Sequence, residues 1–139
     1  MIILDTNVLS ELMRPVPDQR VVDWVESQPN TSLFTSTVTQ AEILFGVSKR
    51  PEGKRKQDLA AIVDAIFEED FRGRLLPFDG PAAVAFASIC SNRARLGRPI
   101  SQFDAQIAAI ARSRGASLAT RNTSDFDACD IQVIDPWGA

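Results

Sequence analysis

The sequence predicts an α/β protein: a three-layer α/β/α sandwich around a central, mostly parallel, five-stranded sheet. The chain opens with a short, uninterrupted apolar run at residues 2–4, which is typical of a strand buried on both faces. Further short apolar runs alternate with longer segments of helical periodicity along the whole chain. With 139 residues, 45% hydrophobic and 24% charged, the composition is that of an ordinary globular protein. We therefore expect a single domain over residues 1–139.

The predicted elements alternate between strand and helix in order. Strands are expected at residues 2–4, 32–35, 75–78, 117–120 and 131–134, because these runs are short and apolar and are bounded by polar or turn-forming residues. Helices are expected at residues 8–13, 21–26, about 40–49, an amphipathic segment spanning 59–67, 81–96 and about 102–114. Gly97 and Gly115 follow the last two helices, where a left-handed residue commonly ends a helix.

The composition excludes several kinds of chemistry. The chain has no histidine, so Ser-His-Asp and Cys-His nucleophiles and His-ligated zinc are ruled out. Its net charge of −3 gives no global positive field that would mark a nucleic-acid binder. Cys90 and Cys129 form no metal or redox motif, and neither a signal peptide nor a membrane-length apolar run is visible. We expect a soluble, unexported, cytoplasmic protein that does not act at a membrane.

Four carboxylates fall where ligands bind in an open parallel sheet, at the carboxyl ends of the strands. Asp5 ends the first predicted strand, and Glu42 lies in the first turn after the second. Asp104 lies in the first turn of its helix, and Asp125 follows the fourth strand. We therefore expect all four to face the same edge of the sheet.

Helix capping is the alternative interpretation for each acid taken alone. Three pairs have, or resemble, the capping-box spacing: Thr39 with Glu42, Ser101 with Asp104, and Asn122 with Asp125. Capping does not require four separate elements to bring acids to one edge, with no basic residue at the same positions. Taken together, the four positions favour a functional cluster.

Such a cluster needs a cation. Two bare carboxylates ~4 Å apart repel by roughly 4 kcal/mol at an effective dielectric constant near 20. Carboxylate oxygens select a hard ion, Mg²⁺ or, as a substitute, Mn²⁺. A divalent ion activates water near neutral pH and stabilises charge on a phosphodiester. Attack by an RNA 2′-hydroxyl usually relies on side-chain acids and bases, often histidine, so attack by metal-activated water, leaving a 3′-hydroxyl and a 5′-phosphate, is the preferred hypothesis.

Four motifs in this order resemble the PIN-domain family, and within it the VapC and FitB toxins of type II toxin–antitoxin operons. The resemblance covers essentially the whole chain, including the terminal Val133-Ile134-Asp135-Pro136-Trp137. The motifs are Ile3-Leu4-Asp5-Thr6-Asn7, Thr39-x-x-Glu42-Ile43-Leu44-x-Gly46, Asp104-x-x-Ile107-Ala108-Ala109-x-Ala111 and Leu118-Ala119-Thr120-Arg121-Asn122-x-x-Asp125-Phe126.

The resemblance implies a Mg²⁺-dependent endoribonuclease toxin that cleaves structured RNA such as tRNA or rRNA and is inhibited by a cognate VapB-like antitoxin. It implies that Asp5 and Asp104 are the principal metal ligands, that Glu42 orients water, and that Asp125 is the fourth acid. A homodimer is also expected. The antitoxin, rather than this chain, would carry the DNA-binding element, because the sequence has no helix-turn-helix or basic arm.

Further residues could support this site. Thr6, Asn7, Thr120 and Asn122 could position water or phosphate, although local turn or cap hydrogen bonding is the alternative for each. Arg121 could contact RNA phosphate or pair with a site acid. A basic connection is the best candidate for an RNA-tracking surface, with a solvated loop as the alternative; it contains Lys49, Arg50, Lys54, Arg55 and Lys56. We expect Phe34, Phe45, Phe86 and Phe103 to pack in the core rather than to stack on bases.

Two other functions remain open. The chain could be a PIN-fold binding protein that acts mainly as the antitoxin's partner in a DNA-binding operon repressor. A strand ending in Asp near the N-terminus also suggests a phospho-aspartyl receiver or a haloacid-dehalogenase-type phosphatase. Such a phosphatase needs a second Asp where this chain has Asn7, and the receiver's paired acids and lysine are not seen.

Overall fold

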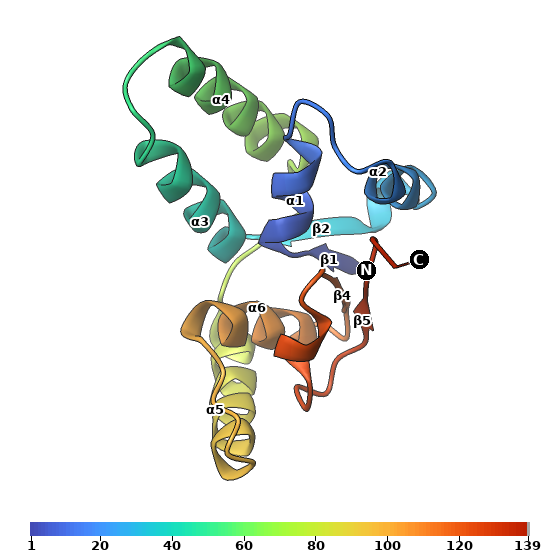
Figure 1. The fold of residues 1–139 in the computed structure, drawn as a ribbon. Helices are drawn as coiled ribbons and strands as arrows, with labels where there is room; N and C mark the ends of the chain where they lie inside the picture. The colour runs from blue at the N-terminus through green and yellow to red at the C-terminus, as the bar shows by residue number, and fades with distance from the viewer. Residues whose placement is uncertain (139) are drawn as a thin grey trace.

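All five strands form one parallel sheet in the structure, a computed structural model that describes residues 1–138 (Figure 1). The strands are β1 (Ile2–Leu4), β2 (Leu33–Ser36), β3 (Leu75–Leu76), β4 (Ser117–Ala119) and β5 (Val133–Ile134). Their order across the sheet is β3-β2-β1-β4-β5, with β1 paired to β2 and to β4. The predicted α/β fold is confirmed, and the sheet is parallel at every pairing.

Helices cover both faces of this sheet. They are α1 (Thr6–Leu12), α2 (Gln19–Glu26), α3 (Thr37–Ser48), α4 (Lys54–Ala65), α5 (Gly80–Arg95) and α6 (Gln102–Ser113), with short helical turns η1 (Asn30–Ser32), η2 (Ile66–Asp70) and η3 (Thr123–Phe126). Helices α1 to α4 lie above the sheet in Figure 1, and α5 and α6 lie below it. The sheet is therefore the middle of three layers.

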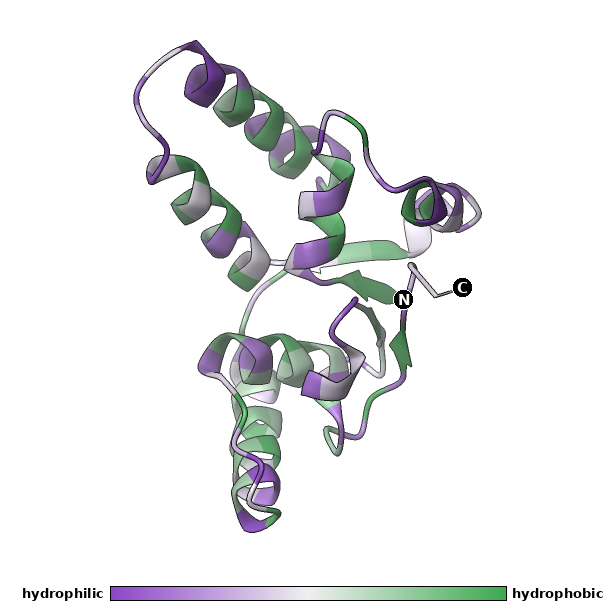
Figure 2. Cartoon of the chain, in the orientation of Figure 1, coloured by the Kyte–Doolittle hydropathy of each residue, from purple (hydrophilic) through white to green (hydrophobic). Residues whose placement is uncertain are grey.

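The strands supply apolar side chains to both faces, as expected for a buried parallel sheet. Ile3 and Leu118 pack with α5 and α6, whereas their neighbours Leu4 and Ala119 pack with α1, α3 and α4. The hydropathy colouring shows apolar strands between helices that carry both polar and apolar residues (Figure 2). Two hydrophobic cores, one on each face, thus fix the strand ends that carry the candidate site.

Two predicted helix ends are confirmed in detail. Gly97 and Gly115 have φ angles of 69° and 63°, the left-handed conformation that glycine adopts without a Cβ clash. After α5, the amide of Arg98 donates to the carbonyl of Arg93 at 2.9 Å, which is the hydrogen bond of a Schellman motif. This turn directs the chain back toward α6.

Several predicted boundaries were wrong. Helix α1 begins at Thr6, two residues earlier than expected, because Asp5 caps it directly. Helix α3 begins at Thr37 because Ser36 is its N-cap. The basic connection is shorter than expected, since Lys54, Arg55 and Lys56 form the first turn of α4.

The predicted burial of two aromatic residues was also wrong. Phe45 and Phe103 are 62% and 53% exposed. Phe45 lies on the outer side of α3 with the Lys49 ammonium 4.6 Å from its ring centre. Apolar periodicity does not separate such positions from the core when a helix is hydrophobic on several sides. No helix within residues 1–138 is long and apolar enough to cross a membrane.

Candidate active site

Three of the four predicted acids line one cavity of about 590 Å³ at the carboxyl edge of the sheet. Asp5 directly follows β1 and is the N-cap of α1, so its backbone is fixed by the central strand. Glu42 reaches the cavity from α3 and Asp104 from the first turn of α6. The strand-end reasoning therefore correctly predicted that these three elements meet at one place.

Asp5 is the most buried of the acids, at 5% exposed, and both of its carboxylate oxygens are hydrogen-bonded. Oδ1 accepts from the Thr6 amide at 2.8 Å, and Oδ2 accepts from the Thr120 hydroxyl at 2.7 Å. The Thr120 oxygen in turn accepts from the Asn7 side-chain amide and from the Asn122 backbone amide, each at 3.2 Å. The first amide of α1 and the Thr120 side chain after β4 thus hold this carboxylate in one orientation.

Glu42 is held by a residue of another helix. The Thr6 hydroxyl donates to Glu42 Oε1 at 2.8 Å, and it lies 3.1 Å from the Thr39 hydroxyl. The capping-box interpretation of Thr39 with Glu42 was wrong, because Ser36 caps α3 and accepts from the Thr39 amide. Glu42 consequently lies in the second turn of α3, where its carboxylate reaches across to α1.

Asp104 lies in a different environment. It is half-buried, and Ser101 is the N-cap of α6, accepting from the Asp104 amide at 3.2 Å. The Ser101–Asp104 pair thus has the predicted helix-start geometry while the Asp104 carboxylate also lines the cavity. Capping and a place in the cluster are compatible at this position.

Asp125 is separate from the other three acids. It lies in the short helix η3, is exposed and does not line the cavity, although it is near enough to Asp104 to raise the pKa of that carboxyl. The capping-box resemblance of Asn122 with Asp125 was wrong, since Asn122 makes no side-chain capping bond. The structure therefore places Asp125 beside the Asp104 end of the cavity.

The electrostatics of the site oppose the accumulation of negative charge. Burial raises the pKa of Asp5 to about 6, and Asp104 and Glu42 add to this increase, while hydrogen bonds from Thr120 and Thr6 oppose it. Burial also raises the pKa of Asp104, with a further contribution from Asp125. None of the four acids forms an ion pair with any residue from 1 to 138.

The residues fit a hard cation in their chemistry. Asp5, Glu42 and Asp104 offer only oxygen ligands to one cavity, and each lacks a cationic partner. No three ligand-type side chains in the described part of the chain stand close enough together to hold an ion as they are placed. Metal binding therefore requires these side chains to converge on the ion.

The basic residues divide into two groups. Arg50 and Arg121 line the acidic cavity, and the Arg121 guanidinium lies 5.2 Å from the ring centre of Trp137. Arg55 lines a second cavity between α1, α3 and α4, of about 580 Å³. The lysines are engaged elsewhere: Lys49 with Phe45, Lys54 with Asp58 at 3.8 Å and Lys56 with Glu52 at 2.6 Å.

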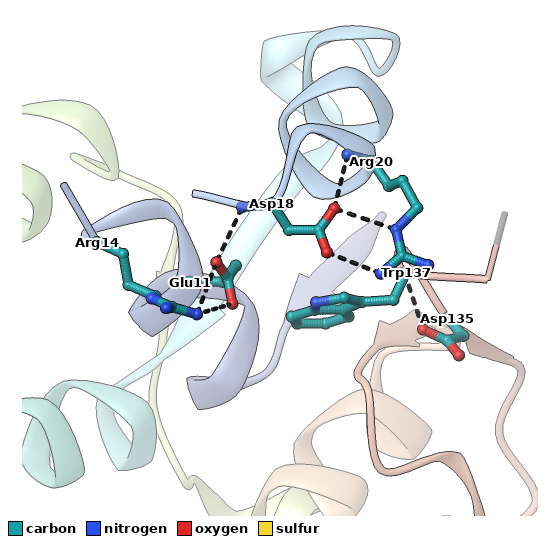
Figure 3. Close-up of polar contacts among 6 residues, drawn as sticks. All are labelled: Glu11, Arg14, Asp18, Arg20, Asp135 and Trp137. Atoms are coloured by element: carbon teal, nitrogen blue, oxygen red, sulfur yellow. Dashed lines mark hydrogen bonds and ion pairs between the residues drawn. The ribbon is translucent and has the colours of Figure 1, made fainter. Parts of the chain in front are cut away.

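Sequence reasoning missed four residues that line the cavity: Ser10, Glu11, Arg14 and Trp137. Arg14 lies 3.3 Å from the buried carboxylate of Glu11, which also accepts from the Asp18 amide at 2.9 Å (Figure 3). Glu11 and Arg14 follow Asn7 at intervals of four and seven residues, so helical spacing could have predicted their common face. Trp137 is buried beside Arg121, and no local sequence signal indicates that the C-terminal segment returns to this site.

Comparison with known proteins agrees with this architecture. The chain is 41% identical over 137 residues to the toxin FitB of Neisseria gonorrhoeae, covering 99% of both chains. It is 38% identical over 137 residues to the VapC ribonuclease Y4jK of Sinorhizobium fredii, covering 99% of this chain and 98% of that protein.

The solved structure of FitAB bound to an IR36 DNA fragment contains a chain that superposes with a TM-score of 0.93 at 41% identity, covering 99% of this chain and 96% of that one. The PIN-domain family model matches residues 2–131. With that match and relatives of this identity and coverage, the chain belongs to the PIN-domain family.

Proposed function

We propose that the protein is a metal-dependent endoribonuclease and the toxin of a VapBC-type toxin–antitoxin pair. The observation that carries the proposal is the shared cavity of Asp5, Glu42 and Asp104, three carboxylates on different elements with no cationic partner among residues 1–138. Relatives named as a VapC ribonuclease and as toxin FitB support the same conclusion.

Asp5 and Asp104 would hold the cation, Mg²⁺ or its substitute Mn²⁺. When bound, such an ion lowers the pKa of water and stabilises charge on phosphate oxygens. Thr120 and Thr6 keep the Asp5 carboxylate oriented toward the cavity, so it needs little reorganisation to bind. Glu42, held by Thr6, would orient the attacking water, and Asp125 would be the fourth acid beside Asp104.

Positive side chains on the cavity wall would bind the RNA backbone. Arg50 and Arg121 line the cavity and form no ion pair with any other described residue, so their charges are available to phosphates. Arg50→Gln should weaken RNA binding. The slope of the logarithm of the binding constant against the logarithm of the salt concentration should become less steep by roughly 0.7, because one phosphate contact is lost. Arg95→Gln, at an exposed arginine of α5 on the other face of the sheet, is the matched control and should leave the slope unchanged.

The partners follow from the same assignment. A cognate VapB-like antitoxin, an RNA substrate and a homodimer are proposed, with DNA contacted through the antitoxin. The similar chain solved as FitAB on a DNA fragment supports a complex of this kind. It also favours a second role for the fold, as the antitoxin's partner in an operon repressor. A cytoplasmic location is also proposed.

The receiver alternative does not fit the fold. Receivers have the strand order 2-1-3-4-5, whereas this sheet has the order β3-β2-β1-β4-β5. No lysine lines the cavity that contains Asp5. The nuclease assignment is therefore the one that the site geometry favours.

Expression of the chain with and without its operon neighbour tests the proposal. The wild-type chain alone should arrest growth, and coexpression of the neighbouring antitoxin gene should relieve the arrest. Asp5→Asn and Asp104→Asn should each abolish toxicity, because each removes a charged ligand while keeping the side-chain size. Equal toxicity of these variants would refute the metal-nuclease assignment, whereas binding to antitoxin and DNA without RNA cleavage would favour the repressor role.

A further inference from the structure

Arg93 is a buried arginine near the end of α5, only 5% exposed. Its guanidinium donates from Nη1 to the carbonyls of Asp125 at 2.9 Å and Asp127 at 3.1 Å, and to Cys129 Sγ at 3.7 Å. Its Nε donates to the carbonyl of Arg98 at 2.7 Å. One side chain thus ties α5 to the segment between β4 and β5, which carries Asp125.

This arrangement is unusual because Arg93 forms no ion pair with any described residue. A buried guanidinium is costly unless its donors are satisfied, and an apolar side chain of similar volume commonly fills such a place at lower cost. Here Nε and Nη1 donate to backbone carbonyls and to the Cys129 sulfur. The hydrogen bonds therefore fix a segment of main chain rather than a carboxylate.

The segment that Arg93 holds is also anchored by the buried Phe126 and by a hydrogen bond from Asn92 to the Ala128 carbonyl at 3.3 Å, but Asp125 itself has few other contacts. The Asp125 side chain is exposed, and it forms no hydrogen bond or ion pair to another residue of the described chain; its backbone is held by Arg93 and by one amide bond to the Asn122 carbonyl. The position of the Asp125 backbone therefore depends on Arg93.

We propose that Arg93 is a positioning residue of the nuclease site, which fixes the backbone beneath Asp125. The inference rests on the proposed nuclease function, because it assigns Arg93 a role toward the metal-binding acids. Removing its hydrogen bonds should loosen the Asp125 segment and weaken Mg²⁺ binding, while the Asp5 end of the cavity stays ordered.

The test compares Arg93→Met and Arg93→Lys in a Cys90→Ser background, so that Cys129 is the only thiol. Cys129 is buried within the held segment and reports its opening through labelling by a maleimide. For Arg93→Met we expect labelling at least about tenfold faster, and a Mg²⁺ concentration for half-maximal RNA cleavage raised about 10- to 100-fold, with little change in KM for RNA. Calorimetric titration with Mg²⁺ should show the same loss of affinity without any substrate.

Arg93→Lys keeps the charge but not the planar fork of donors, so its labelling rate and Mg²⁺ requirement should lie between those of the wild type and Arg93→Met. If Arg93→Met does not fold, the comparison of Arg93→Lys with the wild type tests the proposal. Val63→Ala, in the core on the opposite face of the sheet, is the control for a general loss of stability and should leave the Mg²⁺ requirement unchanged.

The inference is overturned if Arg93→Lys and any folded Arg93→Met keep wild-type Cys129 labelling and Mg²⁺ affinity, or if Val63→Ala weakens Mg²⁺ binding as much as they do. Failure of the proposed function gives a different result: the wild type would cleave no RNA at any Mg²⁺ concentration. In that case, the Mg²⁺ affinity and the Cys129 labelling rate of the Arg93 variants, each compared with the wild type, still decide the role of Arg93.

Discussion

The two ends of the cavity are built differently. At the Asp5 end, a buried carboxylate is bonded to Thr120 and Thr6, and Thr6 also holds Glu42. At the other end, Asp104 is half-buried and Asp125 is exposed. Their backbones are held there: the Asp104 amide donates to the Ser101 hydroxyl, and the Asp125 carbonyl accepts from Arg93. One end is thus fixed by side chains around a buried acid, whereas the other is fixed by a helix start and a short turn. We infer that the Asp5 end sets the geometry of metal binding and that the Asp104–Asp125 end adapts to it.

The largest expected effect separates the acids of the two ends. Asp5→Asn should reduce RNA cleavage by at least about a thousandfold, because it removes a buried ligand that no other side chain can replace. Asp125→Asn should reduce cleavage by only about tenfold, because Asp125 is exposed and outside the cavity. Rates measured on one RNA at saturating Mg²⁺ check this order. Equal losses in both variants would remove the distinction between the ends.

The second prediction concerns stability and pH without metal. The folded state raises the pKa of Asp5 from 3.8 to about 6, so the folded protein holds this proton more tightly than the unfolded chain. Asp5 therefore costs no stability below pH 4, and its penalty grows to about 3 kcal/mol as the pH rises from 4 to 6.

Urea unfolding of the wild type and of Asp5→Asn at several pH values, in the presence of a chelator, checks this prediction. The variant should gain stability relative to the wild type over the same interval. A stability difference that does not change with pH would contradict the burial of an ionisable Asp5.

The third prediction tests the hydrogen bonds at the Asp5 end. Thr120→Val keeps the shape of the side chain but removes the donor to Asp5 and the acceptor for Asn7 and Asn122. We expect the Mg²⁺ concentration for half-maximal cleavage to rise about 10- to 100-fold. The unfolding free energy should fall by about 1–3 kcal/mol, because buried polar groups lose their partners. Unchanged metal dependence would show that Asp5 does not need this support.

The smallest expected effect is at the start of α6. Ser101→Ala removes the N-cap next to Asp104 and should lower the unfolding free energy by about 1 kcal/mol. Cleavage should fall only a few-fold, because the backbone of α6 is also held by its buried face. Thermal unfolding and the cleavage rate measure the two effects. If Ser101→Ala impaired cleavage as much as Thr120→Val, both ends of the cavity would need their hydrogen bonds equally for activity.

The sequence predicted the order of elements and the meeting of Asp5, Glu42 and Asp104, because short apolar runs, helical periodicity and strand-end positions are local signals. The assignment of one domain over residues 1–139 stays a prediction, as do the roles of the site residues. Sequence reasoning could not predict that Thr6 bonds Glu42 across 36 positions, or that Arg93 holds the Asp125 carbonyl across 32. These contacts depend on how α1 packs against α3 and α5 against η3, and local sequence patterns do not predict that packing.

Motif spacing also misplaced the capping residue of α3. Thr39 and Glu42 have the spacing of a capping box, but Ser36 is available three residues earlier and ends a strand whose direction already suits a helix start. The side chain of Glu42 was thereby left free to face α1. The local pattern was compatible with both arrangements, and the packing of α1 against α3 decided between them.

The most direct test of metal-dependent RNA hydrolysis is cleavage of RNA by the purified chain, freed from its antitoxin, with and without a chelator. We predict cleavage that stops in the chelator, returns with excess Mg²⁺ and leaves 5′-phosphate and 3′-hydroxyl ends. Undiminished cleavage in the chelator, or products ending in 2′,3′-cyclic phosphate, would contradict hydrolysis by a metal held between Asp5 and Asp104.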